Sequence, residues 1–422
     1  MTTRGTSFPC VPFEALFAQP QRNGVYKPKE FHGRGVRIVN MGELFEFDFL
    51  GAQPMKRIEL NERELATSLL EAGDLLFARR SLVLEGSGKC SLIRDIPEPT
   101  TFESSIIRVR LRRDESNPWF YYYFFRAPQG RAAMASIATR TAVSGITGTN
   151  LARLLVPRPP RALQDRIVDV LSAYDDLIEN NAKRIEILEE MARSLFREWF
   201  VSFRFPGHEQ VKRVASPIGE APEAWRVVPV NEAVEINPRT QVPSEGEKPF
   251  VPMGGLSHSS MLIEDIEVRE GNSGAKFRNG DTLFARITPC LENGKTGYVQ
   301  FLPDDEAVAF GSTELVVLRE KLLTREMVYL LARSGSFRSH AIKSMTGASG
   351  RQRVQDRCFD TYLVAVPPRP LSERFTEAVR PMFTSVHALA RKSRNLRATR
   401  DLLLPRLISG ELNVSGIEAR RA

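Results

Sequence analysis

The pattern in this chain that could bind a nucleotide phosphate is incomplete. Residues 86–90 read GSGKC and are similar to a phosphate-binding loop, in which backbone amides and a lysine hold the phosphates. Val83 stands where the first glycine of that motif belongs, and Cys90 stands where serine or threonine belongs. The segment therefore does not predict a nucleotide site.

Catalytic and metal-binding patterns are incomplete as well. NPWF at residues 117–120 is similar to the Asn-Pro-Pro-Phe motif of adenine methyltransferases, but Trp119 replaces its second proline and no glycine-rich cofactor loop precedes it. Pro303 and Asp304 lack the Glu-x-Lys partner of a nuclease carboxylate cluster. The five histidines form no close pair, and the four cysteines lie far apart. We therefore expect no catalytic residue, no metal site and no cofactor of the chain's own.

Positive charge is concentrated in two stretches that contain no acidic residue. Residues 116–164 hold six arginines, and residues 333–355 hold four arginines and Lys343, in a chain whose net charge is +8. Phosphate contacts need local rather than global positive charge. The stretches therefore predict two surfaces that contact an anion, and a solvated basic face is the alternative interpretation.

The same text occurs twice along the chain. GDLLFARR at residues 73–80 returns as GDTLFARI at 280–287, and PPRALQDR at 159–166 returns as PPRPLSER at 367–374. The two offsets, 207 and 208 residues, are nearly equal. The sequence therefore predicts two copies of one unit of roughly 205 residues.

Each copy mixes strand and helix patterns before its PPR segment. Alternating or continuous apolar runs predict strands at 104–111, 151–157, 313–318 and 362–367, and helical spacing predicts helices at 61–74, 117–128 and 324–337. We expect a mixed α/β class with two tandem, similar lobes, separated and joined by two long helices in an antiparallel coiled coil. The expected divisions are 1–160, 161–205, 206–370, 371–413 and a tail at 414–422.

The segment after each PPR predicts a long helix with a coiled-coil seam. From Leu163 to Phe200 there is no glycine or proline, and steps of four and three residues give a period of 3.5. The predicted seam residues of the first helix are Ile167, Leu171, Tyr174, Ile178, Asn181, Ile185, Leu188 and Leu195. Those of the second helix are Val379, Met382, Val386, Leu389, Leu396 and Leu403.

Two seam features leave alternatives open. Asn181 either fixes the register of the pair as a buried polar group or lies at a solvated edge. Pro381 lies inside the second segment, so a kink or a late helix start is expected there. A straight helix of 38 residues is about 57 Å long, which places the lobes at opposite ends of the pair and separates their centres by at least about one DNA turn of ~34 Å.

Membrane and export signals are missing from the sequence. No apolar run approaches the ~20 residues of a membrane span, and the N-terminus lacks the basic-then-apolar order of a signal peptide. We therefore expect a cytoplasmic protein without a membrane partner.

The order of lobe, helix, lobe and helix resembles one protein family. Residues 154–207, from LLVPRPPRALQDR to FVSFRFPG, look like the central region of the specificity subunits of type I restriction-modification systems, the HsdS family. Residues 364–412, from VAVPPRPLSER to LLLPRLISGEL, look like their distal region. The two Gly-Asp-apolar strands match those of the family's target-recognition domains, so the resemblance spans the whole chain.

The resemblance implies a non-catalytic subunit that binds double-stranded DNA. In such systems each target-recognition domain reads one half of a bipartite, asymmetric site. Two modification subunits methylate adenine with S-adenosylmethionine, and restriction subunits join for cleavage that uses ATP and Mg²⁺. A free-standing duplicated DNA-binding regulator is the alternative, although it would not need apolar helix surface for other subunits.

Six arginines are candidate DNA contacts. Arg131 and Arg140 come from the first acid-free stretch, and Arg351 and Arg353 come from the second. Arg79 and Arg286 occupy matching places after the repeated strand, where each either contacts DNA or braces its lobe.

Overall fold

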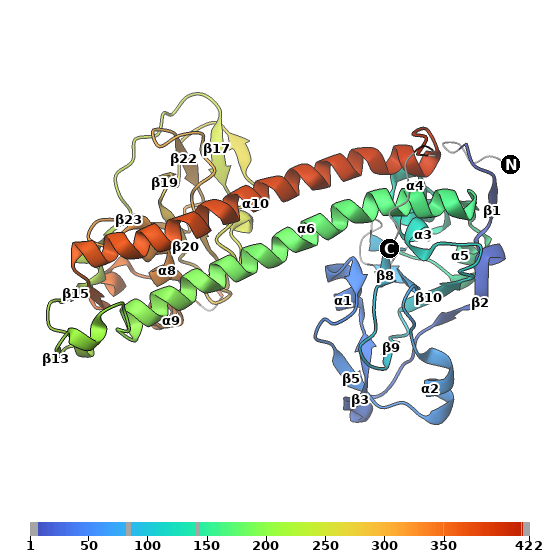
Figure 1. Cartoon of the computed structure of the whole chain (residues 1–422), viewed down its shortest axis with the longest axis horizontal. Coiled ribbons are helices and arrows are strands. Elements are labelled where there is room, and N and C mark those ends of the chain that lie inside the picture. The colour runs from blue at the N-terminus through green and yellow to red at the C-terminus, as the bar shows by residue number, and fades with distance from the viewer. Residues whose placement is uncertain (1–6, 82–85, 140–143, 349, 415, 417–422) are drawn as a thin grey trace. The chain divides into compact units, whose positions relative to one another are not determined.

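The structure is a computed structural model that describes residues 7–81, 86–139, 144–348, 350–414 and 416 (Figure 1). The chain divides into two compact units. One contains the chain up to Leu177 together with the segment from Asn395 onward, and the other contains Ile178–Arg394. Each unit is an α/β lobe with part of both long helices. The predicted mixed α/β class and the order of lobe, helix, lobe and helix are confirmed.

The first lobe is built on two sheets. The larger has the strand order β2-β10-β6-β8-β4 and the smaller β5-β3-β9. Their bounds are Phe17–Asn23 (β2), Ile106–Leu111 (β10), Leu75–Ala78 (β6), Cys90–Ile93 (β8), Phe49–Leu50 (β4), Lys56–Ile58 (β5), His32–Val39 (β3) and Thr100–Phe102 (β9). Two short pairs complete the lobe, β1 (Cys10–Pro12) with β12 (Leu155–Pro157) and β7 (Arg80–Ser81) with β11 (Ser144–Gly145).

Short helices cover these sheets. They are η1 (Phe13–Leu16), η2 (Lys29–Phe31), α1 (Met41–Glu46), α2 (Glu62–Ser68), α3 (Pro118–Arg126), α4 (Pro128–Ile137) and α5 (Gly148–Arg153). In α3 every aromatic residue from Phe120 to Phe125 is buried. These rings share one apolar cluster with Phe77 of the repeated strand, which places the core between α3 and the larger sheet.

The second lobe repeats this plan with two four-stranded sheets, ordered β16-β23-β20-β21 and β18-β17-β22-β19. The strands are Val234–Ile236 (β16), Leu315–Glu320 (β23), Thr282–Ala285 (β20), Thr296–Tyr298 (β21), Glu267–Arg269 (β18), Lys248–Val251 (β17), Val308–Gly311 (β22) and Ala275–Arg278 (β19). β15 (Arg226–Pro229) pairs with β24 (Leu363–Val366), and β13 (Arg213–Ser216) pairs with β14 (Gly219–Pro222). The helices are η5 (His208–Gln210), α7 (Val230–Ala233), η6 (Met253–Gly255), α8 (Arg325–Arg333), α9 (Gly335–Lys343) and η7 (Asp356–Asp360).

The repeated octapeptide forms the same structure in both lobes. Gly73 and Gly280 each have φ +88°, a left-handed conformation that glycine adopts without strain. The buried aspartates that follow, Asp74 and Asp281, each accept two hydrogen bonds from an arginine on the neighbouring strand. All four N–O distances, to Arg110 in the first lobe and Arg319 in the second, are 2.7 Å. The Gly-Asp pair is thus a framework element that turns the chain and anchors the central strand.

The two long helices are α6 (Arg161–Phe196), which continues as the π-helical turn η4 (Arg197–Val201), and α10 (Arg369–Ser409), drawn in green and red in Figure 1. In the first unit, Asp175 near the start of α6 pairs with Arg400 near the end of α10. In the second unit, Asn181 donates a hydrogen bond to Ser393 at 3.1 Å, and the Trp199 ring packs on Phe375. Positions that rise along α6 meet positions that fall along α10, so the pair is antiparallel.

The predicted seam residues are all buried or half-buried. Asn181 is 4% exposed and its partner Ser393 is equally buried, so this polar pair lies inside the seam. Leu177, Ile187 and Leu402, which are off the predicted seam, are 46%, 58% and 73% exposed.

Four expectations about local structure were wrong. The helix expected at 61–74 ends at Ser68, because Leu70 donates its backbone N–H to Thr100 and the Asp74 carboxylate accepts from Glu71. The segment 151–157 begins as helix α5, since Thr147 caps it by accepting from Asn150.

The other two concern α8 and α10. The helix expected at 324–337 breaks at Ser334, whose extended backbone ends α8 and whose side chain caps α9. The late start that Pro381 predicted is wrong, because α10 begins at Arg369 and continues to Ser409. The alternative of a kink stays a prediction. The proline is exposed, and Val379 and Phe383 on either side of it are buried, so packing holds the helix there.

Within the described residues, no helix is both long enough and apolar enough to span a membrane.

Candidate nucleic-acid interface

The repeated strand ends in both lobes at an arginine with the same backbone partners. The N–H of Arg79 donates to Ser105, and its carbonyl accepts from Ile146. The N–H of Arg286 donates to Glu314, and its carbonyl accepts from Val354. Arg79 and Arg286 are therefore structurally equivalent. Each bonds to a residue of the acid-free basic stretch of its lobe, 116–164 in the first lobe and 333–355 in the second. We call this place the strand-end corner.

The returning segment in each lobe closes a hairpin. Thr139 pairs with Gly145 in the first lobe, and Thr346 pairs with Arg353 in the second. The candidate Arg140 follows Thr139 directly and lies outside the described residues. In the second hairpin Arg351 is exposed, next to Gly350 at φ +81°. The structure thus brings Arg286, Arg351 and Arg353 to one corner.

In the second lobe this corner contains an internal ion pair. The guanidinium of Arg353 donates to both oxygens of Glu314, with Nε at 2.8 and 3.0 Å. These hydrogen bonds and the positive charge of Arg353 lower the pKa of the Glu314 carboxyl. The same hydrogen bonds and the negative charge of Glu314 raise the pKa of Arg353. The side chains are 47% and 21% exposed, so the pair is open to solvent and to competing anions. Ser105 and Gly145 stand at these places in the first lobe.

The side chain of Arg286 braces the corner. Its Nη2 donates to the backbone oxygen of Val354 at 3.1 Å and lies 3.8 Å from the Asp356 carboxylate. The bracing role that the sequence left open is therefore present in the second lobe. Arg286 also lines a pocket, so part of its surface faces a cavity.

Arg131 lies outside the hairpin, on α4. It is half-buried, eight residues before Thr139. The pKa of nearby Lys89 is lowered by burial and, against the charge of Asp48, by the positive charges of Arg126 and Arg131. The positive charge of Arg131 therefore lies close enough to Lys89 to influence its pKa.

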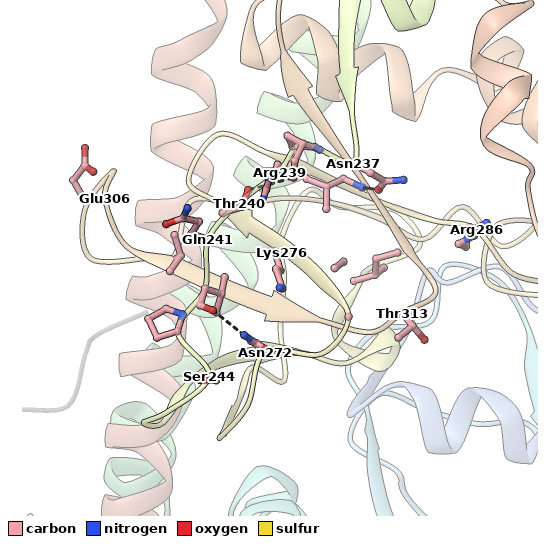
Figure 2. Close-up of a pocket in the computed structure, with 18 residues that line it drawn as sticks. Asn237, Arg239, Thr240, Gln241, Ser244, Asn272, Lys276, Arg286, Glu306 and Thr313 are labelled. Atoms are coloured by element: carbon pink, nitrogen blue, oxygen red, sulfur yellow. Dashed lines mark hydrogen bonds between the residues drawn. The ribbon is translucent and has the colours of Figure 1, made fainter.

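A pocket of about 1110 Å³ opens in the second lobe between the loop 237–244, the segment 272–276 and strands β22 and β23. Figure 2 shows Arg239, Thr240 and Gln241 along one side of it, Lys276 between this loop and Asn272, and Arg286 at the far end. The charged lining residues are Arg239, Lys276, Arg286 and Glu306. Three cations to one carboxylate, with several amide and hydroxyl groups, suit an anionic, hydrogen-bonding ligand.

Sequence reasoning missed Arg239 and Lys276. The loop 237–244, NPRTQVPS, is also acid-free, but it follows the first strand of the sheet rather than preceding the long helix. A search for short acid-free segments after strands, in addition to long basic stretches, would have found it.

The chemistry available at these surfaces is hydrogen bonding and charge. Among the described residues, no group of three or more His, Cys, Asp or Glu side chains lies close enough together to hold a metal ion. The arrangement offers guanidinium, ammonium and amide donors to an extended anion.

Comparison with known proteins identifies a matching family model and several relatives. Residues 43–190 match the family model described as the type I restriction modification DNA specificity domain. Over 92% of its length the chain is 22% identical to the type I restriction enzyme MjaIX specificity subunit of Methanocaldococcus jannaschii, of which it covers 89%. Over 40% of its length it is 31% identical to the EcoKI specificity subunit of Escherichia coli, of which it covers 38%.

The fold is also similar to a solved structure. The crystal structure of the type I restriction-modification system S subunit from M. genitalium superposes with a TM-score of 0.55 at 14% sequence identity. The match covers 96% of this chain and 97% of that one. The similarity therefore extends over both lobes and both long helices.

Proposed function

The chain belongs to the family of type I restriction-modification specificity subunits, and from that premise we propose that each of its lobes reads one half of a bipartite, asymmetric DNA site. The repetition of the strand-end corner carries this proposal. Arg79 and Arg286 have equivalent backbone partners, and each adjoins a hairpin that closes a basic segment. Two lobes with the same backbone framework and different side chains are suited to recognising two different DNA sequences.

The lobes supply binding, and partner subunits supply chemistry. In this proposal two modification subunits methylate adenine with S-adenosylmethionine, and restriction subunits cleave with ATP and Mg²⁺. The paired helices act as the spacer between half-sites and offer exposed apolar side chains such as Ile187 and Met191. The complex works in the cytoplasm, where its DNA lies.

Reconstitution tests this division of labour. Purified alone, the chain is expected to transfer no methyl group from labelled S-adenosylmethionine to DNA and to leave plasmid DNA uncut. Combined with its modification subunits, it is expected to direct methylation to one two-part sequence, and the modification subunits alone are the control. Methyl transfer by the isolated chain would contradict the proposal.

A further inference from the structure

The loop 237–244 is held to the rest of the second lobe by hydrogen bonds at three positions. The Asn237 side chain accepts from the N–H of Val317 at 3.0 Å, and the Asn237 N–H donates to the carbonyl of Val317 at 2.7 Å. The Thr240 hydroxyl accepts from Arg319 at 2.9 Å, the same arginine that holds Asp281. The carbonyl of Val242, a buried residue, accepts from the Asn272 amide at 2.9 Å, a bond drawn in Figure 2. The loop backbone is therefore fixed by the framework itself.

Between these three bonded positions, two side chains point away from the lobe. Arg239 and Gln241 are exposed, whereas Pro238 and Val242 are buried. Within the described part of the chain, neither Arg239 nor Gln241 makes a hydrogen bond or ion pair, in contrast to Arg286, Arg319 and Arg353 of the same lobe. The loop thus presents donors and acceptors that the folded chain does not use.

We propose that Arg239 and Gln241 are the specificity-determining residues of the second lobe, an inference that rests on the proposed function. A guanidinium donates two parallel hydrogen bonds to O6 and N7 of guanine, and a glutamine amide exchanges two with N6 and N7 of adenine. Both pairings need a side chain that reaches a base edge from a fixed backbone. The hydrogen bonds of Asn237, Thr240 and Val242 fix that backbone. Lys276 in the pocket supplies a positive charge for the adjoining phosphates.

The first lobe has a corresponding loop with different chemistry. After β2, the N–H groups of Gly24 and Val25 donate to the carbonyls of Ile106 and Phe102 at 3.2 and 2.8 Å, which fixes this loop as well. The residue that follows, Tyr26, is 81% exposed. One lobe therefore presents an aromatic ring where the other presents a guanidinium and an amide, as two readers of unlike half-sites require.

The test compares four variants in complex with the modification subunits: Arg239→Ala, Arg239→Lys, Gln241→Ala and the control Arg226→Ala. Arg226 is an exposed arginine of the same lobe, on β15. Methylation is measured by sequencing DNA libraries randomised in one half-site at a time. Arg239→Ala and Gln241→Ala are each expected to lower the preference at one base pair of the second half-site by about tenfold, which corresponds to ~1.4 kcal/mol.

Arg239→Lys separates base reading from phosphate binding. Lysine keeps the charge but loses the planar fork, so a base-reading role predicts retained affinity with relaxed preference. If Arg239→Lys restores full preference and Arg239→Ala weakens all sequences equally, Arg239 contacts only phosphate and the inference is wrong. The inference is also wrong if the wild-type complex methylates a two-part site and no variant changes the base preference in the second half of that site. This outcome would leave the proposed function intact. A wild-type complex without a two-part site would refute the proposed function itself.

Discussion

The two lobes share their framework down to single hydrogen bonds but differ in the side chains mounted on it. Gly73, Asp74 and Arg110 return as Gly280, Asp281 and Arg319 with the same φ and the same 2.7 Å contacts. The same backbone bonds also fix Arg79 and Arg286. At the strand-end corner, however, the first lobe has Ser105 and Gly145 where the second has the Glu314–Arg353 ion pair.

This difference shows which parts of the duplicated unit serve folding and which are available for recognition. The Gly-Asp strand is buried, and its aspartate is held by two hydrogen bonds from an arginine in each lobe, so its repetition keeps the fold. The loops after β2 and β16 present exposed side chains that differ between the lobes, so they can be adapted to different DNA sequences.

Removal of a framework aspartate is expected to have the largest effect, and a larger one in the second lobe. Asp281→Ala leaves the nearly buried Arg319 without a carboxylate partner, which costs about 3–5 kcal/mol of folding free energy. Asp74→Ala is expected to cost less, because Arg110 keeps its ion pair with Glu71. Urea denaturation with hydrogen exchange read separately in each lobe measures this. The control is Glu267→Ala, which removes an exposed pair with Arg269 and costs less than about 1 kcal/mol. A large loss in one lobe and none in the other would show that the two frameworks are not equivalent.

A charge in the helix seam is expected to have the next largest effect. Leu188 packs against the apolar core of the second unit, so Leu188→Asp buries a carboxylate and is expected to cost about 2–4 kcal/mol. Its neighbour Ile187 is 58% exposed, so Ile187→Asp is the matched control and should unfold like the wild type. Equal thermal stability of the two variants would contradict the assignment of the seam.

Release of the ion pair at the corner is expected to have a smaller effect, limited to the second lobe. Glu314→Gln frees Arg353 for a phosphate, so DNA affinity at low salt should rise about two- to fivefold, and Ser105→Ala in the first lobe should change nothing. The salt slope of binding should steepen by ~0.9 for one added phosphate contact. Fluorescence anisotropy across a salt series measures both. Unchanged affinity in Glu314→Gln would mean that Arg353 does not contact DNA.

The same pair gives a pH dependence with a defined sign. Because the pKa of Glu314 is lowered in the folded chain, the pair is fully present above the ordinary pKa of a glutamate and is lost as pH falls through the lowered value. The increase in DNA affinity of Glu314→Gln over the wild type should therefore be largest near neutral pH and disappear on acidification. An advantage that grows in acid would contradict this role of the pair.

The sequence was sufficient for the architecture because duplication and heptad spacing are properties of the whole chain. Two nearly equal offsets predicted two lobes, and a period of 3.5 predicted the helices that join them. Local structure was less predictable where tertiary contacts decided it. α2 ends at Ser68 because Leu70 bonds to Thr100, a residue distant in sequence, and α10 passes Pro381 because its buried neighbours hold it.

The candidate site was predicted only in part, for a related reason. The matching places of Arg79 and Arg286 after the repeated strand could be seen in the sequence, but the ion pair between Arg353 and Glu314, 39 residues apart, could not. The three sets of hydrogen bonds that hold the loop 237–244 could not be predicted either, because their partners Val317, Arg319 and Asn272 lie on other segments. Whether an arginine is held internally or left exposed depends on such contacts.

The independence of the two lobes is tested most directly by mapping methylation with one lobe altered at a time. Arg131→Ala with Arg140→Ala alters the first lobe, and Arg351→Ala with Arg353→Ala alters the second. The reconstituted complexes are assayed on DNA libraries randomised in each half-site, with the wild-type complex as reference. We predict that each pair weakens binding or relaxes preference at only one half-site, by ~1–3 kcal/mol for each arginine that hydrogen-bonds to a base in the wild type. If both pairs relax the same bases, the lobes form a single composite site and the two-reader account is wrong.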